Sequence, residues 1–214
     1  MVDPKEGIEF LYRNKVLSNS LDKRIGAEYK VLLDSLGIPG KHFKLGIGAG
    51  SPGVELPDKF VVFCPFTTRP QKFWVNEYWM ELAHHIGNMG YTVVLLGGPG
   101  DRHMVEKIFP NLSGIVDLVG KLGLTESIGV IEKSTAIIGV DTGLTHAGML
   151  LQKPTIAIFG STCPYLETEF EKGVVLYDKL DCSPCKRNPT CNGDITCMRR
   201  LTPDRVISTL SRLI

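Results

Sequence analysis

Acidic, hydroxyl and imidazole side chains follow one apolar segment of the sequence. Residues 136–140 form a short apolar run typical of a buried strand, followed by Asp141, Thr142, Gly143 and His146. Ligands of open α/β sheets bind beyond the carboxyl ends of the strands, and free amides at a helix N-terminus attract phosphate. Gly143 lets a ligand approach the backbone, and Thr142 adds a hydroxyl donor. Asp141 and His146, about one turn apart, can hold the same polar ligand, so the segment indicates an anion site.

The same residues also allow a purely structural interpretation. Asp141 or Thr142 can cap the helix that follows, and His146 can be a solvated helix residue. The segment by itself leaves both interpretations open.

A second polar stretch follows another apolar run. Thr67 and Thr68 can donate hydroxyl hydrogens to phosphate oxygens, and Lys72 can neutralise the charge of a diphosphate leaving group. Trp74 and Trp79 are expected to pack the loop and the next helix onto the sheet, because large aromatic residues chiefly supply core area. Two loops that follow strands therefore offer donors to an anionic ligand.

The elements that position these residues alternate along the chain. The expected strands are 60–64, 92–96, 115–118, 136–140, 155–159 and 174–177. The expected helices are 76–88, 101–109, 124–134, 144–151 and one that starts at Pro203. Strands separated by helices at this spacing predict an α/β fold, a parallel Rossmann-like sheet with helices on both faces.

The segment before residue 60 is different in character. Helical spacing appears at 9–17 and at 25–36, and the Gly- and Pro-rich residues 37–59 are the expected linker. We therefore expect a helical extension with its linker over residues 1–45 and a Rossmann-like domain over residues 46–214.

Composition narrows the class of protein. The chain has 214 residues, 43% of them hydrophobic, and a formal net charge of +1. This size suits one ordinary core with an appendage, and scattered basic residues argue against a nucleic-acid surface. No apolar run approaches the roughly 20 residues that span a bilayer, and the N-terminus lacks the apolar region of a signal peptide. A cytoplasmic protein without a transmembrane segment is predicted.

Two glycine-rich segments need separate interpretation. Residues 48–53 fit the dinucleotide pattern G-x-G-x-x-G, but a strand follows them, whereas that pattern must lie between a strand and a helix. Residues 96–101 directly follow a strand, and Asp101 can accept hydrogen bonds from both hydroxyls of a ribose. The alternative is that Asp101 is the N-cap of the next helix. Ser161 and Thr162, after a later strand, can bond sugar hydroxyls or only their own turn.

Four of the six cysteines lie close together in the sequence, at Cys182, Cys185, Cys191 and Cys197. In a cytoplasmic chain such clustering favours metal over disulfides, and four thiolates can form a tetrahedral zinc site. The second pair is not a Cys-x2-Cys knuckle, which weakens the case for zinc. A structural role is favoured, with metal binding and redox switching as alternatives.

The polar motifs together resemble the C-terminal nucleotide-sugar domain of the lipopolysaccharide heptosyltransferases, glycosyltransferase family 9. The resemblance rests on Thr-Thr-Arg-x-x-Lys-x-Trp at 67–74, Asp-Thr-Gly-Leu-Thr-His at 141–146 and Phe-Gly-Ser-Thr-x-Pro at 159–164. It covers nearly the whole chain but half of the family's usual enzyme, and residues 9–38 look like the helical end of its N-terminal domain. The cysteine-rich loop 182–197 looks like a tail in the branch that adds the second heptose.

The resemblance implies one half of a GT-B fold that binds ADP-heptose for transfer to the lipopolysaccharide inner core, with lipid A–Kdo as acceptor. The implied diphosphate contacts are Thr67, Thr68, Thr142 and Gly143. Lys72 would stabilise charge on the departing ADP, and Asp141 with His146 would orient the phosphates and the sugar. Asp101 would contact the ribose and Leu122 the adenine, although Leu122 can also be an ordinary surface-loop residue. No metal or other cofactor is expected, because cationic and backbone donors can serve the leaving group.

The catalytic base is expected outside this sequence. The family's base is an aspartate of the N-terminal domain, and no segment before Phe60 resembles the glycine-rich opening of that domain. The chain is therefore expected to need an N-terminal acceptor domain. It would be a fragment, a truncated gene product, or one half of a split enzyme whose other chain supplies the base and the acceptor site. The alternative is a nucleotide-sugar-binding or regulatory module without transferase activity. A cytoplasmic location is expected, with peripheral attachment to the inner membrane left open.

Overall fold

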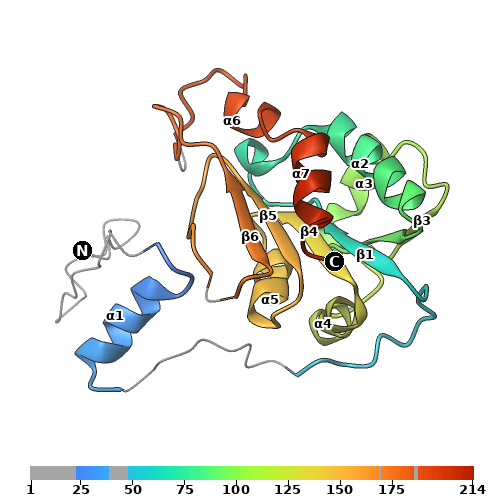
Figure 1. The fold of residues 1–214 in the computed structure, drawn as a ribbon, viewed down its shortest axis with the longest axis horizontal. Helices are drawn as coiled ribbons and strands as arrows, with labels where there is room; N and C mark the ends of the chain where they lie inside the picture. Colours follow the sequence, from blue (N-terminus) through green and yellow to red (C-terminus); the bar gives the residue numbers. More distant parts are fainter. Residues whose placement is uncertain (1–22, 39–47, 169, 186–187) are drawn as a thin grey trace.

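The computed structural model describes residues 23–38, 48–168, 170–185 and 188–214. The helix predicted at 9–17 and most of the extension predicted over 1–45 lie outside the described residues. The strands are β1 (Phe60–Cys64), β2 (Thr92–Leu95), β3 (Ile115–Asp117), β4 (Ala136–Val140), β5 (Thr155–Phe159) and β6 (Gly173–Tyr177). They form one parallel sheet in the order β3-β2-β1-β4-β5-β6, shown in Figure 1. The predicted Rossmann-like sheet is confirmed.

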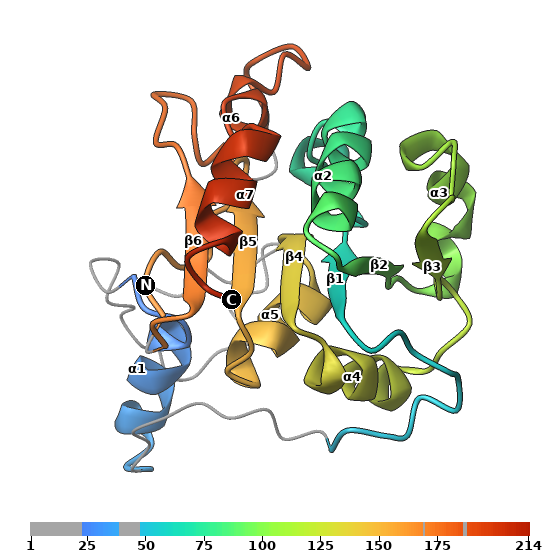
Figure 2. The same cartoon turned by 45° about the vertical axis from the view of Figure 1, so that its right-hand side comes forward.

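Helices cover both faces of this sheet, as Figure 2 shows. On one face lie α2 (Asn76–Asn88), α3 (Arg102–Ile108) and α7 (Pro203–Leu210), and on the other lie α4 (Leu124–Lys133) and α5 (Gly143–Leu150). Short turns η2 (Pro70–Lys72) and η3 (Pro99–Asp101) and a short helix α6 (Thr196–Arg199) complete this part of the chain.

The central strand β1 explains how the two layers are held. All five of its residues are buried, as expected for a parallel strand covered on both faces. Because side chains alternate along a strand, Val61 and Phe63 pack with the α2, α3 and α7 layer, and Phe60 and Val62 pack with α4 and α5. Burying each large apolar side chain contributes about 2 kcal/mol, so the strand ends next to it are held firmly.

Helix α1 (Ala27–Ser35) lies beside the sheet, beyond β6 in Figure 1. It confirms the helix predicted at 25–36 in a slightly shorter form. The residues before it pair with the loop after β5: the Ile25 amide donates to the Glu167 carbonyl at 2.9 Å, and the Leu166 amide donates to the Lys23 carbonyl at 2.8 Å. Arg24 and Glu167 form a parallel bridge. The start of the described chain is thereby attached to the loop that follows β5.

The G-x-G-x-x-G segment lies against the side of α4 and precedes β1. The Gly50 amide donates to the Thr125 carbonyl at 2.8 Å. A Cβ atom on Gly129 would collide with the Gly50 carbonyl oxygen, so this close approach requires glycine at position 129. The segment has the packing of a linker, and it occupies neither the place nor the geometry of a dinucleotide loop.

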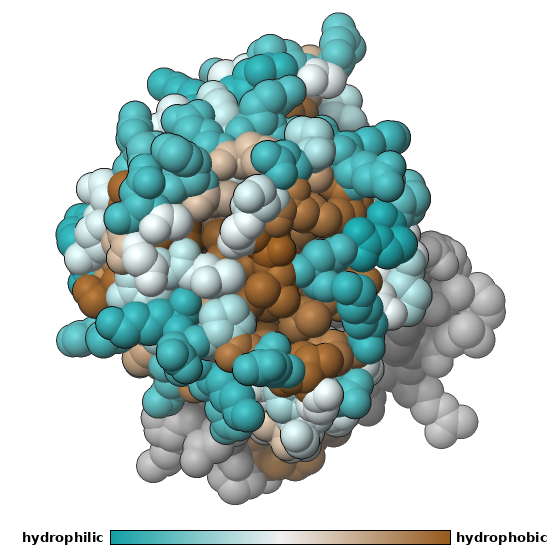
Figure 3. Space-filling view, turned by 90° about the vertical axis from the view of Figure 1, so that its right-hand side faces the viewer, coloured by the Kyte–Doolittle hydropathy of each residue, from teal (hydrophilic) through white to brown (hydrophobic). Residues whose placement is uncertain are grey.

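Apolar side chains are exposed in places on the surface. Figure 3 shows brown residues gathered in the middle of one face, with hydrophilic residues around them. Exposed large hydrophobic residues include Val54, Leu112 and Leu124. Among the described residues, no helix combines the length and the apolar character needed to cross a membrane.

Candidate functional site

The sheet has a switch point between β1 and β4. The chain leaves β1 towards α2 on one face and leaves β4 towards α5 on the other, although the two strands are hydrogen-bonded neighbours. Open α/β sheets bind ligands in the crevice beyond the carboxyl ends of such strands. The two polar stretches singled out in the sequence are the loops that flank this point.

An ion pair connects these two loops. Lys72 Nζ lies 2.6 Å from Asp141 Oδ2, and the side chains are 20% and 11% exposed. Thr162 Oγ1 donates to the same oxygen at 2.5 Å, and His146 Nε2 lies 2.9 Å from Asp141 Oδ1. Side chains from the loops after β1, β4 and β5 and from α5 therefore meet at one carboxylate.

The surroundings of Asp141 keep it ionised. Burial by itself would raise the pKa of Asp141, but hydrogen bonds from His146, Lys72 and Thr162 and the charge of Lys72 outweigh it and hold the pKa well below its ordinary value. An ionised carboxylate can only accept hydrogen bonds, so His146 donates through Nε2. The ammonium group of Lys72 is thereby fixed at the mouth of the switch point.

The other nitrogen of His146 meets a residue that the sequence interpretation missed. His146 Nδ1 lies 2.8 Å from the hydroxyl of Tyr165, which is 4% exposed. Burial, followed by the nearby charge of Asp141, raises the pKa of Tyr165, so its hydroxyl keeps its proton. The signal available in the sequence was its position directly after the 159–164 motif, but nothing local connects it with His146.

The start of α5 fits the predicted anion site. Within the described part of the chain, no side chain caps this helix, and Thr142 at the N-cap position is extended. The carboxylate of Asp141 is engaged elsewhere, and His146 is bonded on both ring nitrogens, so Asp141 is no helix cap and His146 is more than a solvated helix residue. Among the described residues, no side chain bonds to the first amides of α5.

Two glycines shape this helix start. A Cβ atom on Gly139 of β4 would collide with Thr145 Oγ1, so glycine there lets the first turn of α5 close against the strand. A Cβ atom on Gly143 would meet nothing within 4 Å, so the first helical residue faces open space. The turn is tightly packed on the side of β4 and open at Gly143, so a ligand can approach its backbone.

Thr67 and Thr68 lie in the same loop as Lys72. Thr67 is half-buried and Thr68 is exposed. No bond to either hydroxyl is present among the described residues, so both can serve an added ligand.

Asp101 and Leu122 belong to the loops after β2 and β3. Asp101 Oδ2 accepts a hydrogen bond from the Gly98 amide at 2.8 Å and so closes its own turn, while the other oxygen is left for a further donor. Leu122 is half-buried against the cluster that contains Val62 and Ile131. Among the described residues, no contact connects either side chain with the Lys72–Asp141 pair.

The aromatic and cysteine predictions have different outcomes. Trp74 and Trp79 are fully buried, and Trp74 Nε1 donates to the Leu201 carbonyl at 2.8 Å, which confirms their packing role. Cys182, Cys185, Cys191 and Cys197 are all free thiols. Among the described residues, no three histidine, cysteine or acidic side chains gather as metal ligands would. The role of the cysteine-rich loop stays a prediction.

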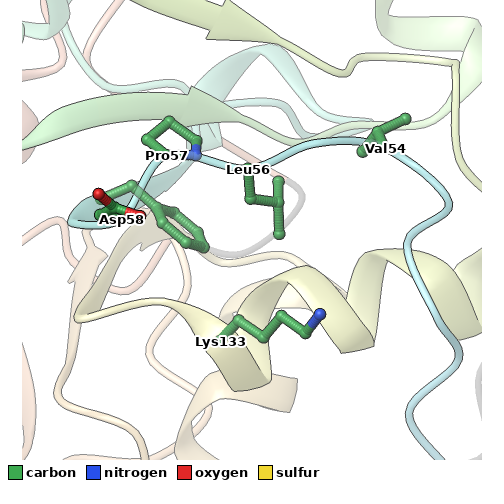
Figure 4. Close-up of a pocket in the computed structure, with 6 residues that line it drawn as sticks. Val54, Leu56, Pro57, Asp58 and Lys133 are labelled. Atoms are coloured by element: carbon green, nitrogen blue, oxygen red, sulfur yellow. The ribbon is translucent and has the colours of Figure 1, made fainter.

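A separate cavity of about 300 Å³ lies near the amino-terminal end of β1, at the other end of the strands from the candidate site. Figure 4 shows its lining, which includes Leu56, Pro57 and Asp58 before β1 and Lys133 near the end of α4. Phe60, the first residue of β1, also lines it, whereas Lys72 and Asp141 follow strand ends. This cavity is therefore no part of the candidate site.

Comparisons with known proteins agree with this fold. The profile of glycosyltransferase family 9 (heptosyltransferase) matches residues 28–195. Lipopolysaccharide heptosyltransferase 1 of Pseudomonas aeruginosa is 28% identical over 172 residues, which cover 72% of this chain and 48% of that protein. Lipooligosaccharide heptosyltransferase 2 of Haemophilus ducreyi is 27% identical over 162 residues, covering 71% and 47%.

A solved structure shows the same fold. E. coli heptosyltransferase WaaC with ADP-2-deoxy-2-fluoro heptose aligns with a TM-score of 0.63 at 20% identity, over 96% of this chain and 60% of that one. The fold defines an α/β protein of the Rossmann-like type. The chain belongs to glycosyltransferase family 9. It spans about half the length of the curated relatives it matches.

Proposed function

We propose that this chain is the donor-binding half of a heptosyltransferase, which binds ADP-heptose for transfer to the inner core of lipopolysaccharide. The Lys72–Asp141 pair across the switch point is the observation that carries the proposal. It places a fixed cation beside the uncapped start of α5, and diphosphates bind such combinations of charge and free amides.

The roles of the other residues follow from their positions. Thr67 and Thr68 would donate to the diphosphate from the Lys72 loop, and Thr142 and Gly143 would do so from the start of α5. Lys72 would neutralise the charge that develops on departing ADP, which lowers the barrier to breaking the sugar–phosphate bond. Asp141, held by His146, would keep Lys72 in place and orient the phosphates and the sugar. Asp101 and Leu122 would contact the ribose and the adenine.

The reaction needs groups beyond this chain. Lipid A–Kdo is the proposed acceptor, and an N-terminal half, in the same or a separate chain, would supply the base and the acceptor site. The heptosyltransferase WaaC was solved with an ADP-heptose analogue, which supports an ADP-sugar as the donor. No metal or other cofactor is needed, because Lys72 and the helix amides serve the leaving group. The location proposed is the cytoplasm, with peripheral attachment to the inner membrane.

The test is calorimetric titration of the purified chain with ADP and ADP-heptose, and with UDP-sugars and NAD for comparison. Lys72→Ala and Asp141→Ala should each weaken ADP binding at least tenfold, since each removes half of the ion pair. Lys133→Ala is the matched control, because Lys133 lines the cavity near the amino-terminal end of β1, at the other end of the strands from the candidate site. Equal affinity for all nucleotides, or unchanged affinity in both variants, would overturn the proposal.

A nucleotide-sugar-binding module without transferase activity is the second candidate. The observation in its favour is that the described site, the Lys72–Asp141 pair and the start of α5, offers groups for the donor alone. Transfer of heptose to lipid A–Kdo, measured after adding an N-terminal half from a relative, separates the two candidates. Turnover that depends on Lys72 supports the transferase, and ADP-heptose binding without turnover supports the module.

A further inference from the structure

Tyr165 contacts the anion site from behind. Its hydroxyl lies 2.8 Å from His146 Nδ1, and the two rings meet at nearly right angles with centroids 5.5 Å apart. Tyr165 is the most deeply buried residue in the chain of contacts that ends at Lys72.

The donors and acceptors of a neutral His146 imidazole fit one arrangement along this chain of contacts. The Asp141 carboxylate can only accept, so the proton of the neutral imidazole is on Nε2. His146 Nδ1 then has a lone pair, and the Tyr165 hydroxyl donates to it. If the Tyr165 hydroxyl were absent, Nδ1 would lose its partner, and only the bond from Nε2 to Asp141 would hold the ring in its orientation.

Packing holds Tyr165 in this position. Its ring makes an edge contact with Phe159, with centroids 5.4 Å apart, and Ile25 packs against the same cluster. The next residues, Leu166 and Glu167, are paired with the backbone of residues 23–25. The hydroxyl is therefore presented by a rigid part of the molecule, as a group that fixes the state of another side chain must be.

We propose that Tyr165 is a positioning residue of the anion site: its hydroxyl holds the imidazole of His146 in the orientation in which Nε2 donates to Asp141, and His146 then holds the Asp141 carboxylate where it binds Lys72. The consequence for ligand affinity rests on the proposed function, whereas the consequence for the imidazole does not. This residue touches no ligand and acts through His146.

Tyr165→Phe tests the proposal, because it keeps the ring and its packing and removes only the hydroxyl. Nitrogen-15 NMR of the histidine side chains should show an Nε2 proton of His146 that exchanges slowly with water in the wild type and about fivefold faster in the variant, because the ring then keeps a single bond. ADP affinity should fall about fivefold, the value of one lost hydrogen bond. Tyr177→Phe is the matched control, because its hydroxyl pairs with Ser183 and not with His146. It should leave the His146 signals unchanged and the ADP affinity within about twofold of the wild type.

The imidazole signal and the ADP affinity test two separate parts of the proposal. Equally slow exchange of the His146 Nε2 proton in Tyr165→Phe and in the wild type overturns the proposal, whatever happens to affinity. Faster exchange with unchanged ADP affinity also overturns it, because His146 would then not position the site. A wild type that binds no nucleotide counts against the proposed function, and the imidazole spectrum then decides the inference by itself. Melting temperatures of both variants show whether the ring packing is intact.

Discussion

The loops on the two sides of the sheet centre hold their polar side chains in different ways. After β1 and β4, charged groups pair over long stretches of sequence: Lys72 meets Asp141, and Asp141 meets Thr162. After β2 and β3, two acidic side chains close their own turns: Asp101 accepts from the Gly98 amide, and Glu126 accepts from the Gly123 amide at 2.6 Å. One ion pair also joins these segments, between Arg102 at the start of α3 and Asp117 at the end of β3.

This difference separates two uses of polar groups. A side chain that closes its own turn stabilises the local backbone, and its loss costs stability. A half-buried ion pair between distant loops loses hydration and side-chain freedom, so the pair as a whole adds little to stability, although removal of one partner leaves the other charge unpaired and destabilises the fold. We therefore expect substitutions at the Lys72–Asp141 pair to affect ligand binding most and those at Asp101 to affect folding and binding together.

The largest effect on ADP affinity is expected from reversing the charge of Lys72. Lys72→Glu would set a carboxylate against Asp141 and against the diphosphate of the ligand. ADP affinity should fall about a hundredfold or more, the scale expected when a charged partner is lost and a like charge replaces it. Lys59→Glu makes the same charge change on the exposed residue before β1 and should leave affinity within about twofold, because surface charges there act weakly. Calorimetry checks both, and equal losses in the two variants would show that net charge alone is responsible.

The second prediction concerns stability against pH. The folded pKa of Asp141 lies below its unfolded value, so the carboxylate contributes stability that is present above the unfolded pKa and is lost as the pH falls through the folded one. Asp141→Asn removes this contribution and should cost about 2 kcal/mol of unfolding free energy near pH 7. The gap between wild type and variant should narrow as the pH falls below about 4, near the ordinary pKa of aspartate. Urea unfolding at several pH values measures it, and a constant gap down to pH 3 would contradict the assignment.

The smallest effect is expected in the loop after β2. Asp101→Ala removes the bond to the Gly98 amide and should destabilise the fold by about 1 kcal/mol. If Asp101 also binds the ribose as proposed, ADP affinity should fall about fivefold. Asn111→Ala removes a similar local bond, to the Ser113 amide, from the turn before β3 and should cost stability alone. Identical binding by the two variants would reduce Asp101 to a turn residue.

The regular elements could be predicted because their signals are local. The bounds of β1, β4 and β5 and of α2 are those expected from apolar runs and helical spacing. The other elements differ by about one residue at their ends, and two differences lie at helix starts: the helix expected at 101–109 begins at Arg102 after a short turn, and the helix expected at 144–151 begins at Gly143. Proline and glycine at these starts set the backbone angles residue by residue, which periodicity does not resolve.

The site was predicted as a set of residues and not as a network. Motifs brought Lys72, Asp141 and His146 into consideration, but their pairing depends on the order of strands in the sheet. Tyr165 was missed because its partner lies on α5, on the other side of β5 in the sequence, and a tyrosine after a proline carries no periodic signal. Contacts between segments far apart in the sequence can be predicted only when the order of the strands is known.

The short pairing of residues 23–25 with the loop after β5 bears on how the chain can be trimmed. A version that started at Gly26 would keep every strand of the sheet and every proposed ligand contact. It would nevertheless lose the backbone bonds that Lys23 and Ile25 make with Leu166 and Glu167, next to Tyr165. Shortened versions intended for ligand soaking should therefore begin before Lys23, since the cut would otherwise loosen the loop that holds Tyr165 beside the site.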